Sequence, residues 1–590
     1  MLRVARERLL ATIALPQPSI VTDAGASHKQ FALDLAARWL LDGLWVPDKS
    51  DGRDVRLGWL FPGLFLFVFA FYALTGPGYS TSLDGSLMLL SARNLLRSGS
   101  TTVPAVAELT RRGLDGREYP KFGPGLVLAH LPVLFAVGHL EFLRPVLDAH
   151  PVSSLDRDAF YAPLTNAALM AATVCGIGLC GVALGFAVRS SVLLAALMAV
   201  GSPLWLYART DSSEALQCAC LIGASYCLLR ERGSIGTASA FVAGIFLAAA
   251  IATKALNFIV LPWFVLFAAW RTPSRKTVVV VSLASPPVVA GALLVAFNWL
   301  RFGASLETGY EITPSLFGHR LLDGAYVQLF SVGHGLVLFC PAFMLLPLAV
   351  RRCAQRMPAE GALVAVVFLT FLLAFSKWWA YWGMNWGPRF LVPAVPLVAL
   401  GLMPLAEPSS HARVLLLALL ALGTAVQAVA VTTSYWGQVM PVWMRLAPPP
   451  ALDRGSDPRM KDIGLWNYLV HRPEVAPLRV GIWWLRNASC QEPEERPPKL
   501  STPPWAAEHP WIDPQHDTEL LGELRGLDLW AVPECLRLRY APLWAPQSRR
   551  PIPASPRLFW ILLGIGCLGL GLVSRALSRR SCNRDRQSSR

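Results

Sequence analysis

Long apolar stretches separated by short polar connections dominate this chain. A helix needs about 20 apolar residues to cross the hydrocarbon core of a membrane, and unpaired backbone groups are not tolerated there. We therefore predict an all-α polytopic membrane protein with about twelve transmembrane helices. The predicted spans are residues 57–74, 160–188, 191–207, 213–230, 234–252, 254–270, 277–298, 330–350, 359–376, 388–405, 412–432 and 557–574.

The predicted membrane topology depends on whether a further apolar run, from Gly125 to Leu140, crosses the membrane. If it crossed the membrane, the basic cluster of Arg271, Arg275 and Lys276 would lie outside, against the tendency of such clusters to stay in the cytoplasm. If it lies on the surface or re-enters the same face, the basic clusters fall inside. We therefore predict a surface or re-entrant helix at 125–140, twelve spans, and both termini in the cytoplasm.

This topology divides the chain into four parts. Residues 1–56 form a basic cytoplasmic arm, and residues 57–432 form the transmembrane core, which includes a large first outer loop at 75–159. Residues 433–556 form a Pro- and Trp-rich extracytoplasmic segment that is too long to be a mere connection. Residues 557–590 form a final span and a basic cytoplasmic tail.

The composition supports the membrane assignment and offers an explanation for the positive net charge. Hydrophobic residues make up 54% of the chain and charged residues 15%. The net charge of +15 does not indicate a nucleic-acid partner, because the basic residues flank the apolar spans, where orientation and anionic membrane lipids explain them. Cys490 and Cys535 fall in the outer segment, where an oxidising compartment permits a disulfide, and their spacing leaves that pairing open.

The first outer loop contains two candidates for chemistry. Asp84 stands at the start of a helical pattern that ends at Ser98-Gly99, where the helix dipole favours an ionised carboxylate that can act as a base. Its alternative is a simple helix cap. Lys121 directly precedes an apolar helix, and an ammonium group there suits a phosphate, although lysines at such places also merely extend to the interface.

Cations also recur at the later outer turns, beside acids and aromatics. Arg and Lys residues that only anchor a helix would be expected mainly on the cytoplasmic side, yet here they recur at the predicted outer turns. We therefore predict that these cations form a site for a phosphate-bearing lipid headgroup. Aromatic rings at the membrane interface form belts, but they also bind sugars or prenyl chains by apolar contact. The residues concerned are Arg209, Asp211, Glu214, Lys254, Arg301, Glu307, Lys377, Trp378, Trp379, Trp382, Trp386 and Arg389.

The order of these motifs resembles bacterial membrane glycosyltransferases of the type C superfamily, above all the group of family 39 protein mannosyltransferases and lipid A aminoarabinose transferases. The resemblance runs from about residue 57 to residue 432. It is carried by Asp84-Gly, Asp-Gly-Arg-Glu-Tyr-Pro-Lys121-Phe-Gly-Pro-Gly, Tyr207-Ala-Arg209 with Glu214, Asn-Trp-Leu-Arg301-Phe-Gly with Glu307-Thr-Gly-Tyr310, and Trp-Gly-Pro-Arg389-Phe.

The resemblance implies a site as well as a fold. It places the general base, or the group that positions the acceptor, on Asp84, and the lysine-and-proline motif on Lys121. The chain departs from the family twice: it has Lys-Phe-Gly-Pro where relatives often have Lys-Pro-Pro, and Gly85 where they commonly have a second acid. The second departure leaves the use of a divalent metal cofactor open.

The implied reaction moves a sugar from a polyprenyl-phosphate donor to a lipid, glycan or protein acceptor on the extracytoplasmic face of the bacterial inner membrane. Asp84 would take the acceptor proton, and cations would neutralise the departing phosphate. We expect Asp211 and Glu214 to form ion pairs with Arg209 rather than to hold a cation, and residues 433–556 to cap the site or bind the acceptor. The predicted phosphate-binding residues are Lys121, Arg301, Arg389, Lys254 and Arg209, and the predicted pocket residues are Tyr119, Tyr207, Glu214, Glu307, Tyr310, Lys377, Trp378, Trp382 and Trp386.

Two other functions use the same cations. A transporter or flippase for a lipid-linked sugar also needs phosphate-binding groups, but is expected to place ionisable residues within its spans and to show repeat symmetry. A non-catalytic envelope scaffold would leave Asp84 dispensable. In this chain the charges collect at one predicted face, which favours the enzyme.

Overall fold

The computed structural model describes most of the transmembrane core and part of the outer segment. The described residues are 57–76, 82–106, 109–139, 161–231, 233–309, 314–380, 383, 385–408, 410–433, 435, 470–471, 476–487 and 556–578. The predicted N-terminal arm, Cys490, Cys535, Tyr310 and Trp382 lie outside them.

Within the described residues, six helices are long and apolar enough to cross a membrane. They are α7 (Pro163–Ala183), α13 with the 3-10 turn η3 before it (Pro273–Phe302), α17 (Pro358–Lys377), η6 with α18 (Arg389–Ala406), α19 (Arg413–Thr432) and α25 (Pro556–Ser578). Shorter apolar helices are α3 (Leu57–Leu74), α5 (Pro124–His139), α8 (Val188–Gly201), α10 (Glu214–Leu229), α11 (Thr237–Thr253) and η2 with α12 (Ala255–Arg271).

The chain is thus an all-α polytopic membrane protein, and all predicted spans but two fall on these helices. The number of crossings, the sidedness and the surface position of α5 stay predictions. One exception is 191–207, which the structure divides at the extended residue Ser202 into α8 and the short helix α9 (Leu204–Ala208). The other is 330–350, where the prediction of one helix was wrong. Pro341 and Pro347 lack the N–H that a continuous helix needs, and the chain forms α14 (Leu321–Phe330), α15 (Leu336–Phe339), η5 (Pro341–Leu345) and α16 (Leu346–Arg356).

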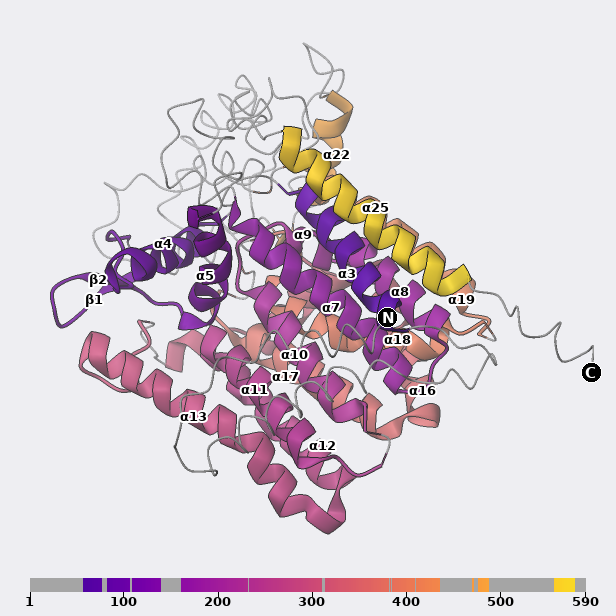
Figure 1. Cartoon of the computed structure of the whole chain (residues 1–590), viewed down its shortest axis with the longest axis horizontal. Coiled ribbons are helices and arrows are strands. Elements are labelled where there is room, and N and C mark those ends of the chain that lie inside the picture. The colour runs from indigo at the N-terminus through magenta and orange to yellow at the C-terminus, as the bar shows by residue number, and fades with distance from the viewer. Residues whose placement is uncertain are drawn as a thin grey trace, which may run out of the picture.

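The first outer loop contains the predicted helix and a hairpin that was not predicted. Helix α4 (Leu83–Ser98) ends at Gly99, whose φ of 69° is a left-handed conformation that glycine adopts without strain. Strands β1 (Thr110–Arg112) and β2 (Glu118–Pro120) pair antiparallel, with Arg111 opposite Tyr119. Figure 1 shows α4, α5 and this hairpin together at one edge of the helical body.

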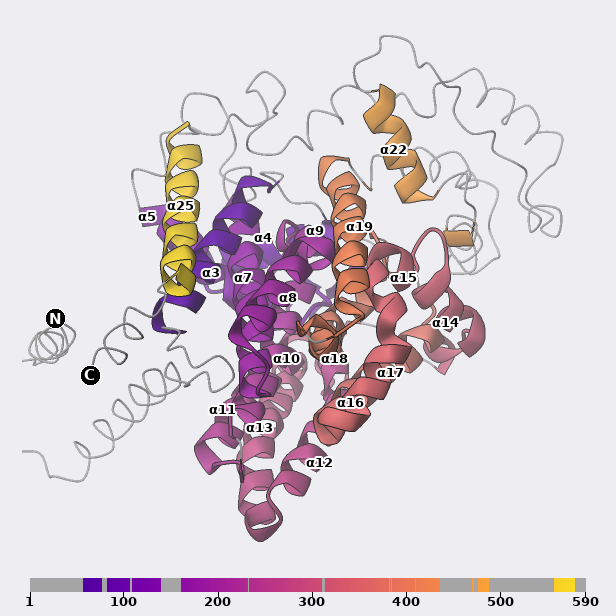
Figure 2. The ribbon, with the colours of Figure 1, turned by 90° about the vertical axis from the view of Figure 1, so that its right-hand side faces the viewer.

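The helices differ in how deeply they lie in the body. Helix α18, with η6 before it, is 94% buried over its apolar window, whereas α13 is 17% buried and presents most of its surface outward, as a lipid-facing helix does. Helix α25 packs along α3 at the periphery, although the two lie at opposite ends of the chain (Figures 1 and 2). A side chain at the start of η6 therefore belongs to the centre of the bundle, and one on α13 to its edge. Helix α22 (Pro477–Asn487) packs on α19, and the short 3-10 helix η4 (Pro314–Phe317) precedes α14.

Candidate active site

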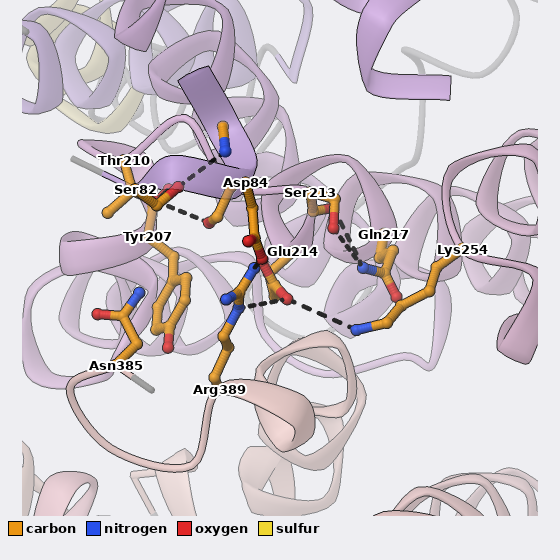
Figure 3. Close-up of polar contacts among 12 residues, drawn as sticks. Ser82, Asp84, Tyr207, Thr210, Ser213, Glu214, Gln217, Lys254, Asn385 and Arg389 are labelled. Atoms are coloured by element: carbon orange, nitrogen blue, oxygen red, sulfur yellow. Dashed lines mark hydrogen bonds and ion pairs between the residues drawn. The ribbon is translucent and has the colours of Figure 1, made fainter. Parts of the chain in front are cut away.

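Asp84 lies in the first turn of α4 and contacts Arg389, the first residue of η6. Arg389 Nη2 donates to Asp84 Oδ2 over 3.1 Å, and the Asp84 side chain is 26% exposed (Figure 3). The helix is capped by Ser82, whose Oγ accepts a hydrogen bond from the backbone N–H of Gly85 at 3.0 Å. The capping role considered for Asp84 therefore belongs to Ser82, and the Asp84 carboxylate is turned to the guanidinium.

Glu214 joins two cations in the same place. It is the first residue of α10 and is fully buried; its Oε1 accepts from Arg389 Nε at 2.9 Å and lies 3.8 Å from Lys254 Nζ (Figure 3). Both acids stand at helix N-termini, where the dipole favours a negative charge. We call Asp84, Glu214, Lys254 and Arg389 the charged cluster: two carboxylates and two cations brought together from four separate elements.

Of the two cations in this cluster, Lys254 has the longer contact to a carboxylate, 3.8 Å against 2.9 and 3.1 Å for Arg389. It lies in the extended link between α11 and η2, so the predicted span at 254–270 begins one residue later, at Ala255. Its ammonium lies 4.5 Å from the centre of the Phe390 ring, and its side chain is 27% exposed. Burial lowers the pKa of Lys254 to about 8, although Glu214 acts in the opposite direction.

The loop before α10 explains why the chain has Gly85 in place of a second acid. A Cβ at Gly85 would lie 2.1 Å from Cγ of Asp211, so any side chain there would have to displace the Asp211 carboxylate. Asp211 is fully buried, and its Oδ1 accepts from Ser82 Oγ at 3.2 Å. Asn166 on α7 holds this loop by donating to the carbonyls of Thr210 and Ser212 at 2.7 and 2.8 Å. The space of a second acid is thus filled by a carboxylate from another part of the chain.

The expected pairing of Glu214 with Arg209 was wrong. Glu214 pairs with Arg389 and Lys254, while Arg209 is 5% exposed and its Nε donates to the carbonyl oxygen of Thr75. Loop geometry is the reason, because Glu214 already belongs to α10 and faces the bundle centre, whereas Arg209 closes the short helix α9 (Leu204–Ala208).

Arg301 lies in a second polar region, at the end of α13, where it holds the first-loop hairpin. Its Nη1 donates to the carbonyl of Pro120 at 3.0 Å and its Nη2 to Asn298 Oδ1 at 2.9 Å. The guanidinium lies 3.9 Å from the Phe297 ring centre and 4.6 Å from that of Phe302, and Arg301 is 6% exposed. We call this set of contacts the hairpin anchor. Arg301 is sealed by protein rather than open to a phosphate.

The other residues predicted near Arg301 also serve the anchor. Glu307 Oε2 lies 3.3 Å from Arg111 Nη2, and its Oε1 accepts from the Gly309 N–H at 2.9 Å. The Tyr119 hydroxyl donates to Asp115 Oδ2 at 2.8 Å. Burial, and secondarily that hydrogen bond, raise the pKa of Tyr119. The Arg111–Glu307 ion pair ties strand β1 to the chain that follows α13, and the Tyr119–Asp115 bond braces the hairpin itself.

Lys121 directly follows strand β2, and the glycines after it pack against the end of α11, next to the charged cluster. A Cβ at Gly309 would lie 2.6 Å from Lys121 Cβ, so the anchor packs directly against the lysine. A Cβ at Gly123 would lie 2.3 Å from the Ala252 carbonyl oxygen, and one at Gly125 would lie 2.7 Å from Thr253 Cα. The Lys-Phe-Gly-Pro-Gly sequence therefore lets the backbone of this motif touch the end of α11, next to Lys254.

The predicted aromatic and neighbouring pocket residues divide into fully buried and partly exposed positions. Tyr207 is fully buried and donates to the Trp386 carbonyl at 3.4 Å, and Trp386, 1% exposed, packs edge-on against Phe339 at 5.2 Å. Trp386 is thus a core residue and not an open sugar platform. Trp378 lies edge-on to Phe317 at 5.1 Å, and the Lys377 carbonyl accepts from the His319 N–H at 3.2 Å.

Among the described residues, no group of three or more His, Cys, Asp or Glu side chains could hold a metal ion. The sequence interpretation also missed Ser82, although a serine directly before a helical pattern is a cap signal, and it missed the buried amides Asn166, Gln217 and Asn257. A polar side chain inside an apolar run is the signal that could have identified these amides.

No family model and no curated protein matches this chain. Among solved structures it is similar to ArnT from Cupriavidus metallidurans bound to undecaprenyl phosphate, with 14% identity over 88% of this chain and 78% of that chain and a TM-score of 0.40. It is also similar to the oligosaccharyltransferase of Archaeoglobus fulgidus in the apo form, with 13% identity over 74% of this chain and 61% of that chain and a TM-score of 0.36. At such scores the likeness carries no argument about function, which is therefore argued from the charged cluster.

Proposed function

We propose that the protein is an integral membrane glycosyltransferase that moves a sugar from a polyprenyl-phosphate donor to an acceptor hydroxyl on the extracytoplasmic face. The charged cluster is the observation that supports this proposal: a partly exposed carboxylate at a helix start is held beside two cations in a membrane-embedded bundle. A base next to cations is what transfer from a phosphate leaving group requires.

In this mechanism Asp84 is the general base. Arg389 bonds Oδ2 of Asp84, which leaves Oδ1 to accept the proton of the acceptor hydroxyl. The acceptor oxygen forms a bond to the anomeric carbon while the bond between that carbon and the phosphate oxygen breaks, and the electron pair leaves with the lipid phosphate. Lys254 and Arg389 stabilise that developing negative charge.

Glu214 has a supporting role, because it is fully buried and bonded to both cations. A largely buried arginine next to a second cation would be costly without a carboxylate between them. Glu214 therefore keeps the two cations in the bundle centre before the donor arrives. Lys254, 3.8 Å from Glu214 and partly exposed, has the freedom to turn to a phosphate.

A turnover assay tests this proposal. Membranes with wild-type protein are given radiolabelled polyprenyl-phosphate hexoses and pentoses, and transfer of label is compared with that of Asp84→Asn. We expect Asp84→Asn to lower turnover by at least about 100-fold, as loss of a general base does, while binding of undecaprenyl phosphate stays within about twofold. The matched control is Asp323→Asn, which changes an exposed acid of α14.

The same assay separates the alternatives. A transporter would move labelled donor across the membrane without transferring its sugar, and a scaffold would neither bind nor turn over the donor. Full turnover by Asp84→Asn would reject Asp84 as the base.

A further inference from the structure

Two buried amide side chains link the elements that carry Glu214 and Lys254. Gln217 lies one turn into α10 and is 1% exposed, and Asn257 lies in η2 and is 2% exposed. Asn257 Nδ2 donates to Gln217 Oε1 at 3.0 Å. Two uncharged polar groups thus meet in an otherwise apolar interior, directly behind the charged cluster.

Gln217 holds the start of α10. Its Nε2 lies 3.3 Å from the carbonyl oxygen and 3.4 Å from the Oγ of Ser213, the residue before Glu214 (Figure 3). The first carboxylate position of the helix is therefore fixed by an amide one turn further along.

Asn257 holds the break in the chain that presents Lys254. Its Nδ2 lies 3.1 Å from the Lys254 carbonyl and 2.9 Å from the Ala250 carbonyl, and its backbone N–H donates to the same Lys254 carbonyl at 2.9 Å. Helix α11 ends here, and Lys254 is extended, with φ −147° and ψ 111°. Carbonyls at such a break need donors in an apolar interior, and Asn257 supplies them.

Buried amides are costly unless their hydrogen bonds are made, so this pair constrains both elements at once. Neither side chain reaches the surface, so neither can touch a substrate. The effect of either must pass through Glu214 or Lys254.

We propose that Gln217 and Asn257 are positioning residues that set the spacing between the Lys254 ammonium and the Glu214 carboxylate, and so aim Lys254 at the donor phosphate. This inference rests on the proposed function, because it names the residues that prepare its phosphate-binding lysine.

A double-mutant cycle tests the inference. Undecaprenyl phosphate binding is measured on the purified full-length protein in lipid nanodiscs for wild type, Gln217→Met, Lys254→Ala and the double variant. We expect Gln217→Met to weaken binding about tenfold in the wild-type background and less than about twofold in the Lys254→Ala background, because contacting networks are non-additive. If Gln217 had a purely structural role, Gln217→Met would weaken binding by the same factor in the wild-type and the Lys254→Ala backgrounds.

The matched control is Gln427→Met. Gln427 is equally buried, on α19, and donates to the Phe339 carbonyl at 2.6 Å outside the cluster; its loss should leave binding unchanged. If Gln217→Met does not fold, Gln217→Asn, which keeps the amide, replaces it in the same cycle.

The outcomes are distinct. Equal factors in the two backgrounds, no effect of Gln217→Met, or an equal loss in Gln427→Met overturns the inference alone. Absence of binding by the wild type overturns the proposed donor, and the inference with it.

Discussion

The charged cluster and the hairpin anchor contain the same kinds of side chain at helix ends, yet they are built for different tasks. In the cluster, Arg389 bonds two carboxylates, one of them partly exposed. In the anchor, Arg301 bonds a backbone carbonyl and an amide and lies against two phenyl rings. None of the described carboxylates forms an ion pair with it. The two arginines therefore differ in their partners: Arg389 joins the carboxylates of the proposed reactive site, whereas Arg301 supports the hairpin.

The two regions nevertheless depend on each other. The anchor fixes the hairpin that ends in Lys121, and the glycines after Lys121 pack against the end of α11, beside Lys254. A substitution in the hairpin anchor should therefore have only a small effect on the charged cluster, because it can act there only by shifting the backbone next to Lys254.

The largest expected effect on binding comes from Arg389→Met. The change removes one of the two proposed phosphate-binding cations and leaves Glu214 with Lys254 alone, so we expect affinity for undecaprenyl phosphate to fall about 100-fold, in the range for breaking a buried charge pair. The control is Arg356→Met, which breaks an exposed ion pair to Glu407 at 3.3 Å. Binding measured in nanodiscs that stays at the wild-type level in Arg389→Met would remove the cluster from the donor site.

A smaller effect should follow from pH. Because burial lowers the pKa of Lys254 to about 8, this lysine is charged below pH 8 and loses its proton above it. The second pKa of a phosphate is about 6, so the ligand keeps its charge from pH 7 to 10. Affinity for undecaprenyl phosphate should therefore be flat near pH 7 and fall by up to about tenfold between pH 8 and pH 9.

Lys254→Arg is the matched variant, since arginine stays protonated throughout this range. Its affinity should stay level from pH 7 to 10. An equally steep fall in Lys254→Arg would show that another group titrates.

The smallest effect on binding is expected for Arg301→Met. Because Arg301 supports the hairpin and is sealed from the surface, affinity should change by less than about threefold, whereas amide hydrogen exchange at residues 110–120 should become faster as the hairpin loosens. A loss of affinity as large as that of Lys254→Ala would erase the distinction between the two regions and return Arg301 to the phosphate-binding set.

Local pattern was sufficient to predict most of the fold. The apolar stretches fall on helices, and the helix after Asp84 ends at Ser98, before Gly99, as its pattern predicts. The failure at 330–350 has a local cause that apolar composition hides, because prolines interrupt the helix without making the stretch less hydrophobic.

The pairing within the site could not be predicted in the same way. Asp84 and Arg389 are separated by 305 positions, and Arg389 and Glu214 by 175. Their contact depends on how α4, α10 and η6 pack, which no local pattern contains. Gly85 shows the same limit: in sequence it is a missing acid, and only the position of Asp211 shows what a side chain there would have to displace.

A structure of the protein with bound undecaprenyl phosphate would show directly where the donor phosphate lies. We predict phosphate oxygens within about 3 Å of Lys254 Nζ or the Arg389 guanidinium, on the side of the cluster where Asp84 is exposed. A phosphate bound at Arg301, or at any place remote from Asp84, would rule out Asp84 as the base of the transfer.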